Sequence, residues 1–278
     1  MDLYQAVTDR IIAQLEEGTI PWHKPWIASG SCVSHATGKP YSLLNQMLLG
    51  RPGEYATFNQ IRQTGGSVRK GENAHMVVFW KWITTENDET GKEKEVPFLR
   101  YYNVFHLDQC EGITAKHLLP TPQKAYAHSR SASLIADYIA REKVTIRHER
   151  GDRAFYRPVT DIVVLPEMAQ FHSTAEYYST AFHELIHSTG HGTRLNRLDS
   201  TAFFGSEAYG KEELIAEIGA AALLNHTGLE TSGSFRNSAA YIQSWLKVLQ
   251  NDKCMIVSAA GKAEKAVQLI LGNVSKKA

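Results

Sequence analysis

Hydrophobic and polar positions in the first third of the chain follow helical spacing at first and strand spacing later. Residues 4–17 place Val7, Ile11 and Leu15 on one helical face and stop before a glycine, which predicts an amphipathic helix. Residues 57–64 predict a second, shorter helix, because two glycines follow them at once.

Two later stretches are rich in aromatic and β-branched residues. Residues 75–82, with the sequence HMVVFWKW, and residues 98–107 each predict a strand. The charged residues 86–95 between them predict the tip of a hairpin. We therefore expect a small α+β domain with an antiparallel sheet in this part of the chain.

The second half of the chain predicts several helices and two short strands. Ser173 and Glu176 have the spacing of a capping box, so a helix is expected to begin there and to run to about Gly190. Glycine lacks a Cβ, which suits the left-handed residue that ends many helices. Further helices are predicted over residues 130–141, 211–226, 239–249 and 262–271, and strands over residues 144–148 and 162–165.

Aromatic residues and metal-binding spacing are separated along the chain. Four of the five tryptophans lie in residues 1–110, whereas the metal-type motif lies beyond residue 180. Residues 112–127 contain Pro120 and Pro122 in a polar setting, which is typical of a linker. Two domains are expected, over residues 1–120 and 121–278.

The formal net charge of +1 over 278 residues excludes a bulk electrostatic attraction to duplex DNA. No apolar run reaches the ~18–20 residues needed to cross a bilayer, and the N-terminus does not have the pattern of a signal peptide. A cytoplasmic protein without a membrane partner is expected. Cys32, Cys110 and Cys254 are odd in number and scattered, which disfavours disulfides and thiolate metal sites.

An HExxH motif occupies residues 183–187, inside the helix predicted after Ser173. The four-residue spacing puts His183 and His187 on one helical face, where both imidazoles can bind one cation. A zinc site with a catalytic water needs a third protein ligand, and the pKa of that water falls to about 7. Glu184 is then the predicted catalytic base, which takes the proton of the water.

Two schemes can supply the third ligand. The motif HExxHxxGxxH is excluded, because Thr193 stands where its last histidine is required. The other scheme uses a glutamate from a second helix, and Glu213 and Glu217 lie at i and i+4 on one face. This pair resembles the ExxxD motif of thermolysin-like zincins, with Glu in place of Asp.

That resemblance implies that Glu213 binds the metal and that Glu217 orients a ligand histidine. The longer side chain of Glu217 leaves the reverse assignment open. A simpler alternative also stays open, in which all these side chains are ordinary polar residues of amphipathic helices. The predicted strand over residues 162–165 is either an edge strand for an extended peptide substrate or an ordinary core strand.

Cationic and aromatic residues are neighbours in the first domain. Aromatic rings stack on unpaired bases at ~1–3 kcal/mol each, while lysine and arginine follow the phosphates. Alternatively, the tryptophans fill the core of a small domain. In residues 75–82 both strand faces carry apolar groups, so at most one face can be a platform. On this chemistry the candidate DNA-contacting residues are Trp22, Trp26, Arg69, Lys70, Trp80 and Lys81.

Several motifs carry a family resemblance that covers nearly the whole chain. They are GTIPWHKPW at residues 18–26, TGKPY at 37–41, GGSVRKG at 65–71, YNVFHLDQ at 102–109, and the segments 183–191 and 212–217. In these motifs the chain resembles antirestriction proteins of the ArdC type. The resemblance implies an N-terminal domain that binds single-stranded DNA, related to the N-terminal part of plasmid TraC primases, and a C-terminal zincin-like metallopeptidase domain.

The resemblance also implies that a plasmid or other mobile element carries the protein and that it protects incoming DNA from host restriction. One hypothesis is a zinc-dependent peptidase held on single-stranded DNA that cuts an unidentified host protein, with Mn²⁺ or another divalent ion as an alternative to Zn²⁺. The other is a non-catalytic protein that protects DNA by occupancy, with a structural or vestigial metal site. A nuclease is disfavoured, because the sequence lacks a carboxylate-rich two-metal pattern.

Overall fold

The computed structural model describes residues 2–23, 31–86, 93–117, 126–198, 207–229 and 239–273, which pack into two compact units. Unit 1 is formed by Met1–Pro21, Ser29–Pro120 and Ile242–Ser258. Unit 2 is formed by Trp22–Ala28, Thr121–Tyr241 and Ala259–Ala278. The predicted domains 1–120 and 121–278 stay a prediction. The two units differ from them at two segments, because Trp22–Ala28 groups with unit 2 and Ile242–Ser258 groups with unit 1.

The first helix of unit 1, α1 (Leu3–Glu16), has the predicted amphipathic character. Its Val7, Ile11 and Leu15 side chains are fully buried, and the Asp2 carboxylate caps the first turn by accepting from two backbone amides. The Thr8 hydroxyl donates to the carbonyl oxygen of Lys253 at 2.8 Å, which links α1 to the C-terminal segment of the same unit. Two shorter helices follow, α2 (Leu43–Leu49) and α3 (Phe58–Gln63), with short 3-10 turns at Pro21–His23 and Leu107–Gln109.

Unit 1 contains a sheet with the strand order β1-β2-β5-β4. Its strands are β1 (Cys32–Ser34), β2 (Gly53–Thr57), β4 (His75–Glu86) and β5 (Glu93–His106), and a separate pair is β3 (Ser67–Val68) with β6 (Cys110–Glu111). The predicted antiparallel pairing is confirmed for β4 and β5, whereas β1 pairs with β2 in parallel.

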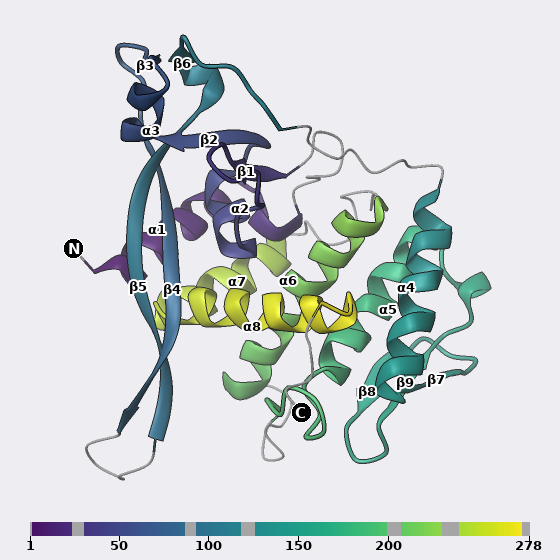
Figure 1. Cartoon of the computed structure of the whole chain (residues 1–278). Helices are drawn as coiled ribbons and strands as arrows, with labels where there is room; N and C mark the ends of the chain where they lie inside the picture. The colour runs from purple at the N-terminus through teal and green to yellow at the C-terminus, as the bar shows by residue number, and fades with distance from the viewer. Residues whose placement is uncertain are drawn as a thin grey trace. The chain divides into compact units, whose positions relative to one another are not determined.

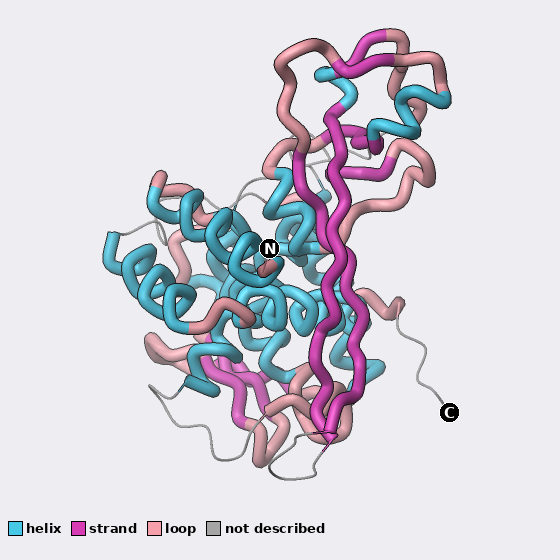
Figure 2. The backbone as a smooth tube through the Cα atoms, turned by 90° about the vertical axis from the view of Figure 1, so that its left-hand side faces the viewer, coloured by secondary structure: helices cyan, strands magenta, loops and turns pink. Residues whose placement is uncertain are grey.

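The β4–β5 hairpin is longer than the sequence pattern predicts, as Figure 2 shows. Pairing runs from His75 opposite Val104 to Glu86 opposite Glu93, so charged residues assigned to the tip belong to the strands. The remaining tip, residues 87–92, lies outside the described residues. The base of the hairpin is anchored in the unit 1 core, where Val77 and Val104 pack with Tyr55.

Unit 2 contains a small sheet beside its helices. The strands are β7 (Thr145–His148), β8 (Phe155–Arg157) and β9 (Ile162–Leu165), in the order β7-β9-β8. β9 is parallel to β7 and antiparallel to β8, which has no clear sequence signal because it is only three residues long. The edge-strand interpretation of residues 162–165 is therefore wrong: this apolar segment is the central strand, and β8 is an edge among the described strands.

The helices of unit 2 are α4 (Ala127–Glu142), α5 (Thr174–Ser188) and α6 (Glu207–Thr227), while α7 (Ala239–Asn251) and α8 (Met255–Ile270) each contribute residues to both units. α4 and the small sheet lie beside α5 (Figure 1). α5 begins as predicted, because the Ser173 hydroxyl accepts from the Glu176 amide at 3.2 Å. None of the helices in the described ranges has the length and apolar character needed to span a membrane.

The predicted role of Gly190 as a left-handed helix end is wrong. α5 ends at Ser188, and Gly190 does not have a positive φ. The glycine is instead needed for a close approach: a Cβ there would lie 2.7 Å from Leu198 Cγ and 3.1 Å from Arg197 Cγ. The backbone amides of both these residues donate to the Gly190 carbonyl oxygen. This turn brings Arg197 back toward α5.

Candidate functional site

Helices α5 and α6 lie side by side because a glycine stands at their contact (Figure 1). A Cβ on Gly219 of α6 would lie 2.6 Å from Cδ1 of Ile186, which is fully buried on α5. The missing side chain therefore lets the two helices approach closely. This approach brings the HExxH residues of α5 within reach of the glutamates of α6.

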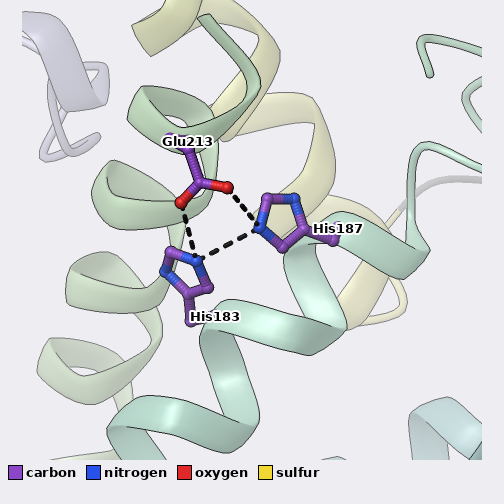
Figure 3. Close-up of side chains that lie close together, drawn as sticks. All are labelled: His183, His187 and Glu213. Carbon is purple, nitrogen blue, oxygen red and sulfur yellow. Dashed lines mark hydrogen bonds and ion pairs between the residues drawn. The ribbon is translucent and has the colours of Figure 1, made fainter. Parts of the chain in front are cut away.

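Three side chains converge between these helices, as Figure 3 shows. The Nε2 atoms of His183 and His187 are 3.1 Å apart. The Glu213 carboxylate places Oε2 3.3 Å from the His183 Nε2 and Oε1 3.5 Å from the His187 Nε2. The sequence-predicted ligand set is thus brought together at one point, with half-buried side chains.

These distances fit a single divalent cation. Bonds of about 2.0–2.1 Å to nitrogen and oxygen in a tetrahedral arrangement require donor atoms about 3.3 Å apart. The Nε2–Nε2 separation of 3.1 Å is near that value, and one ligand atom from each of the three residues lies within 4.8 Å of the other two. The donor types, two imidazoles and one carboxylate, are those of catalytic zinc sites with three protein ligands.

Glu212 orients one of the two histidines, a role that the sequence pattern did not predict. Its Oε1 lies 3.1 Å from the His187 Nδ1, and its two oxygens accept from Arg197 at 2.8 and 3.0 Å. A carboxylate on the second ring nitrogen fixes the tautomer, so that Nε2 carries the free electron pair toward a metal.

The pKa values of this pair reflect their contact. Burial disfavours the charged imidazolium, but the hydrogen bond and charge of Glu212 outweigh it and raise the pKa of His187. Burial likewise disfavours the ionised form of Glu212. His187 and Arg197 outweigh this effect and hold the pKa of Glu212 below its usual value.

Glu217 lies beside the other histidine. Its Oε1 is 3.7 Å from the His183 Nδ1, which is longer than a hydrogen bond. The His183 Nδ1 atom is buried and has no hydrogen-bond partner in the described part of the chain. The geometry therefore puts Glu217 on the outer side of the His183 ring and Glu213 on the inner side.

Glu184 is buried, with 7% of its surface exposed. Burial raises the pKa of its carboxyl group, and the neighbouring His187 and His183 moderate that rise. β8 packs against α5, and the backbone of its residue Tyr156 slightly lowers the pKa of this carboxyl group. The predicted base is thus a buried carboxyl group on the helix that carries both histidines, and its pKa is raised.

The tryptophans nominated for DNA contact are placed in different environments. Trp22 is 2% exposed, so its ring belongs to the packed interior in this structure. Trp26 lies outside the described residues, and Trp80 on β4 is half-buried. Their proposed contacts with DNA stay predictions.

The cationic candidates are exposed where their side chains are described. Arg69 donates to the Asp108 carbonyl oxygen and forms an ion pair with Glu72 at 3.2 Å. Lys70 is exposed in the same turn, and Lys81 is described only in its strand position on β4. Their contacts with DNA are likewise predictions.

Two family models match this chain. The N-terminal domain of the anti-restriction factor ArdC matches residues 1–105, and a zincin-like metallopeptidase family matches residues 134–262. The fold and the site therefore define a protein with an ArdC-type N-terminal domain and a zincin-like domain.

Curated relatives agree with this classification. A DNA primase TraC of Escherichia coli is 37% identical over 96% of this chain, and a second TraC of that organism is 36% identical. The chain spans only 27% and 20% of the lengths of these two primases. An uncharacterized protein y4eC of Sinorhizobium fredii is 33% identical over 95% of this chain and 90% of its own length.

Solved structures extend the similarity to the three-dimensional fold. The metal-free structure of the antirestriction ArdC protein from plasmid R388 has 38% identity and a TM-score of 0.74, covering 98% of both chains. Its Mn(II)-bound structure has 36% identity and a TM-score of 0.76, covering 100% of both. The chain belongs to the ArdC family of antirestriction proteins, and the predicted α+β architecture with a zincin-like domain is confirmed.

Proposed function

We propose that this protein protects the DNA of a mobile element from host restriction by combining a metal-dependent peptidase site with binding to single-stranded DNA. The observation that carries the proposal is the convergence of His183, His187 and Glu213 beside the buried Glu184. Membership of the ArdC family supports the antirestriction role, and the match to zincin-like metallopeptidases supports the chemistry.

The cation we propose is Zn²⁺, held by His183, His187 and Glu213, because two imidazoles and one carboxylate are the donor set of catalytic zinc sites and lie close enough to share one ion. The Mn(II)-bound structure of the R388 protein supports a divalent cation in this family and makes Mn²⁺ the alternative. When bound, such a cation polarises a substrate carbonyl and acidifies a water molecule.

The chain's own residues supply the remaining steps. Glu184 takes the proton of the attacking water and delivers it to the leaving amine. Glu212 holds the His187 imidazole in orientation through its second ring nitrogen, and the Glu217 carboxylate lies 3.7 Å from the corresponding nitrogen of His183. An extended peptide lies along β8, because this edge strand passes Glu184 at Tyr156.

The substrate we propose is a protein of the host cell, and the proposed site of action is the cytoplasm, where incoming DNA meets restriction enzymes. The DNA-binding part is proposed to be the domain of residues 1–120, with Arg69 and Lys70 among its contacts. Both residues are exposed in the turn between β3 and β4.

Replacing the proposed base tests whether protection requires catalysis. Glu184→Gln removes the proton acceptor but keeps the side-chain volume, and Glu176→Gln in the first turn of the same helix is the matched control. The assay is survival of a plasmid carrying restriction sites after transfer as a single strand into a restricting host. We expect Glu184→Gln to lose protection while it keeps its affinities for metal and single-stranded DNA. Full protection by this variant would show that the protein acts by occupancy.

A further inference from the structure

The register of the β4–β5 hairpin separates charges between its two faces. Directly paired residues share a face, and successive residues alternate. Phe79 pairs with Arg100, and Lys81 pairs with Phe98. These four residues therefore share one face. Within strand residues 75–86 and 93–106, every lysine and arginine falls in the register of this face, and every glutamate falls in the register of the opposite face. The same register also contains Val77 and Val104, which are buried at the base of the hairpin. We give the name basic face to six other residues of this register: Phe79, Lys81, Lys94, Phe98, Arg100 and Tyr102.

Large aromatic side chains on this face are open to solvent. Phe79 is 63% exposed, Tyr102 49% and Phe98 45%. The Phe79 and Tyr102 rings contact edge to face with centroids 6.1 Å apart, and the Arg100 guanidinium lies 5.9 Å from the Phe98 ring centre. Exposed rings gathered on one strand face mark an interaction surface, because the part of the chain that the structure describes does not cover them.

We infer that the basic face is the platform on which unpaired bases of single-stranded DNA stack, with Arg100 following the phosphates. The inference rests on the proposed DNA-binding function and assigns it a surface. Alternating aromatic and cationic residues suit a single strand, because its bases offer free faces to a ring. A protein partner fits less well, because interface cores are depleted of lysine.

This surface differs from the one that local sequence chemistry suggests. Lys81 lies in the register of the basic face, whereas Trp80 falls in the opposite register with Tyr101 and Leu99. Leu99 is buried, and Trp80 is half-buried. The less conspicuous Phe79 and Tyr102 are the exposed rings, although Val77 and Val104 of the same register are buried at the base of the hairpin.

Alanine variants on the two faces test the inference. Phe79→Ala and Tyr102→Ala each remove one ring from the basic face, and Tyr101→Ala removes a ring of matched size and 46% exposure from the opposite face. The probe is a labelled oligothymidylate of about 12 nucleotides, measured by fluorescence anisotropy with the full chain. We expect each basic-face variant to weaken binding by about fivefold or more, and Tyr101→Ala to leave it unchanged.

Two further variants separate stacking from apolar docking and from loss of charge. Phe79→Leu keeps an apolar side chain but has no π-face, so we expect it to weaken DNA binding. Phe79→Trp keeps a π-face, so we expect it to retain DNA binding. Arg100→Ala should lower the salt slope of binding by about 0.7, which is the loss of one phosphate contact. Arg147→Ala, an exposed cation of β7 in unit 2, should leave the slope unchanged.

The outcomes distinguish this inference from the function on which it rests. Normal oligothymidylate affinity in Phe79→Ala and Tyr102→Ala would overturn the basic face as the platform, while single-strand binding itself would stand. Equal losses in Tyr101→Ala, or full affinity in Phe79→Leu, would overturn stacking on this face. If the wild-type protein does not bind the oligonucleotide, both the DNA-binding function and this inference are wrong.

Discussion

The close approach of α5 and α6 at Gly219 can be tested with a pair of glycine variants. Gly219→Ala adds a methyl group that would lie 2.6, 2.9 and 3.2 Å from three side-chain atoms of Ile186. Gly210 lies on the same helix, and Gly210→Ala is the control because no described neighbouring atom lies within 4 Å of the added Cβ. The two changes are therefore chemically identical but differ in the space available.

The expected magnitudes follow from this difference. In an open helical position, alanine is favoured over glycine by about 1 kcal/mol, so Gly210→Ala should stabilise the protein by about that amount. At Gly219 the same gain is opposed by overpacking, which costs about 1–3 kcal/mol. Ile186 is fully buried and β-branched, so it has little freedom to move away. Gly219→Ala should therefore lower the free energy of unfolding by about 0–2 kcal/mol relative to wild type, and leave it about 1–3 kcal/mol below that of Gly210→Ala.

The measurements are denaturant unfolding of wild type and both variants, and metal affinity by competition with a chelating dye. We expect Gly219→Ala to weaken metal binding as well, because moving α6 away from α5 carries Glu213 away from the two histidines. Gly210→Ala should bind metal like wild type. Equal stability of the two variants would refute the close helix contact, and unchanged metal affinity in Gly219→Ala would refute its role in assembling the site.

Two further predictions concern buried carboxylates. Glu212→Gln should lower metal affinity about 10–100-fold, because it loosens His187 and weakens the bond to Arg197. Competition with a chelating dye measures this affinity. An affinity equal to that of wild type would show that Glu212 has no role in metal binding. Glu54 is buried, which opposes ionisation, but two backbone amides and the His35 ring outweigh burial and lower the pKa of Glu54 from 4.5. Its ionised form therefore adds stability above about pH 4.5 that is lost as the pH falls through the lower folded-state pKa. Urea unfolding of Glu54→Gln should show a flatter acid profile than wild type, and identical profiles would contradict this assignment.

The elements of the candidate metal site were predictable where the signal is local. The HExxH spacing places two histidines on one face of any helix that contains it. The Ser173 cap marks where the helix with this motif begins. The i, i+4 spacing of Glu213 and Glu217 likewise shows that these two glutamates share one face of α6. These features depend on residues a few positions apart, so the sequence pattern contains them.

Features set by tertiary contacts were not predictable in the same way. Glu212 is adjacent to Glu213 and points about 100° away around the helix, so no periodicity connects it with His187. Arg197 reaches Glu212 from an irregular turn that Gly190 makes possible. Gly190 suggested the end of a helix, whereas in the structure its missing side chain allows Arg197 and Leu198 to approach closely.

The hairpin shows the same limit for strands. The charged residues near its tip suggested a loop, but their alternation continues the strand register to Glu86 and Glu93. Only the pairing of β4 with β5 shows that the cations share one face. The pattern within either strand alone does not contain this information.

Metal content per chain tests the central claim most directly. Wild type, His187→Ala, Glu213→Ala and Glu217→Ala are purified, loaded with Zn²⁺ or Mn²⁺, dialysed and measured by mass spectrometry. We predict about one divalent ion per chain for wild type, loss of the ion in His187→Ala and Glu213→Ala, and a weakened but detectable site in Glu217→Ala. Retention of the ion in Glu213→Ala with its loss in Glu217→Ala would reverse the assigned roles of the two glutamates. A wild-type chain without bound metal would contradict the proposed peptidase site.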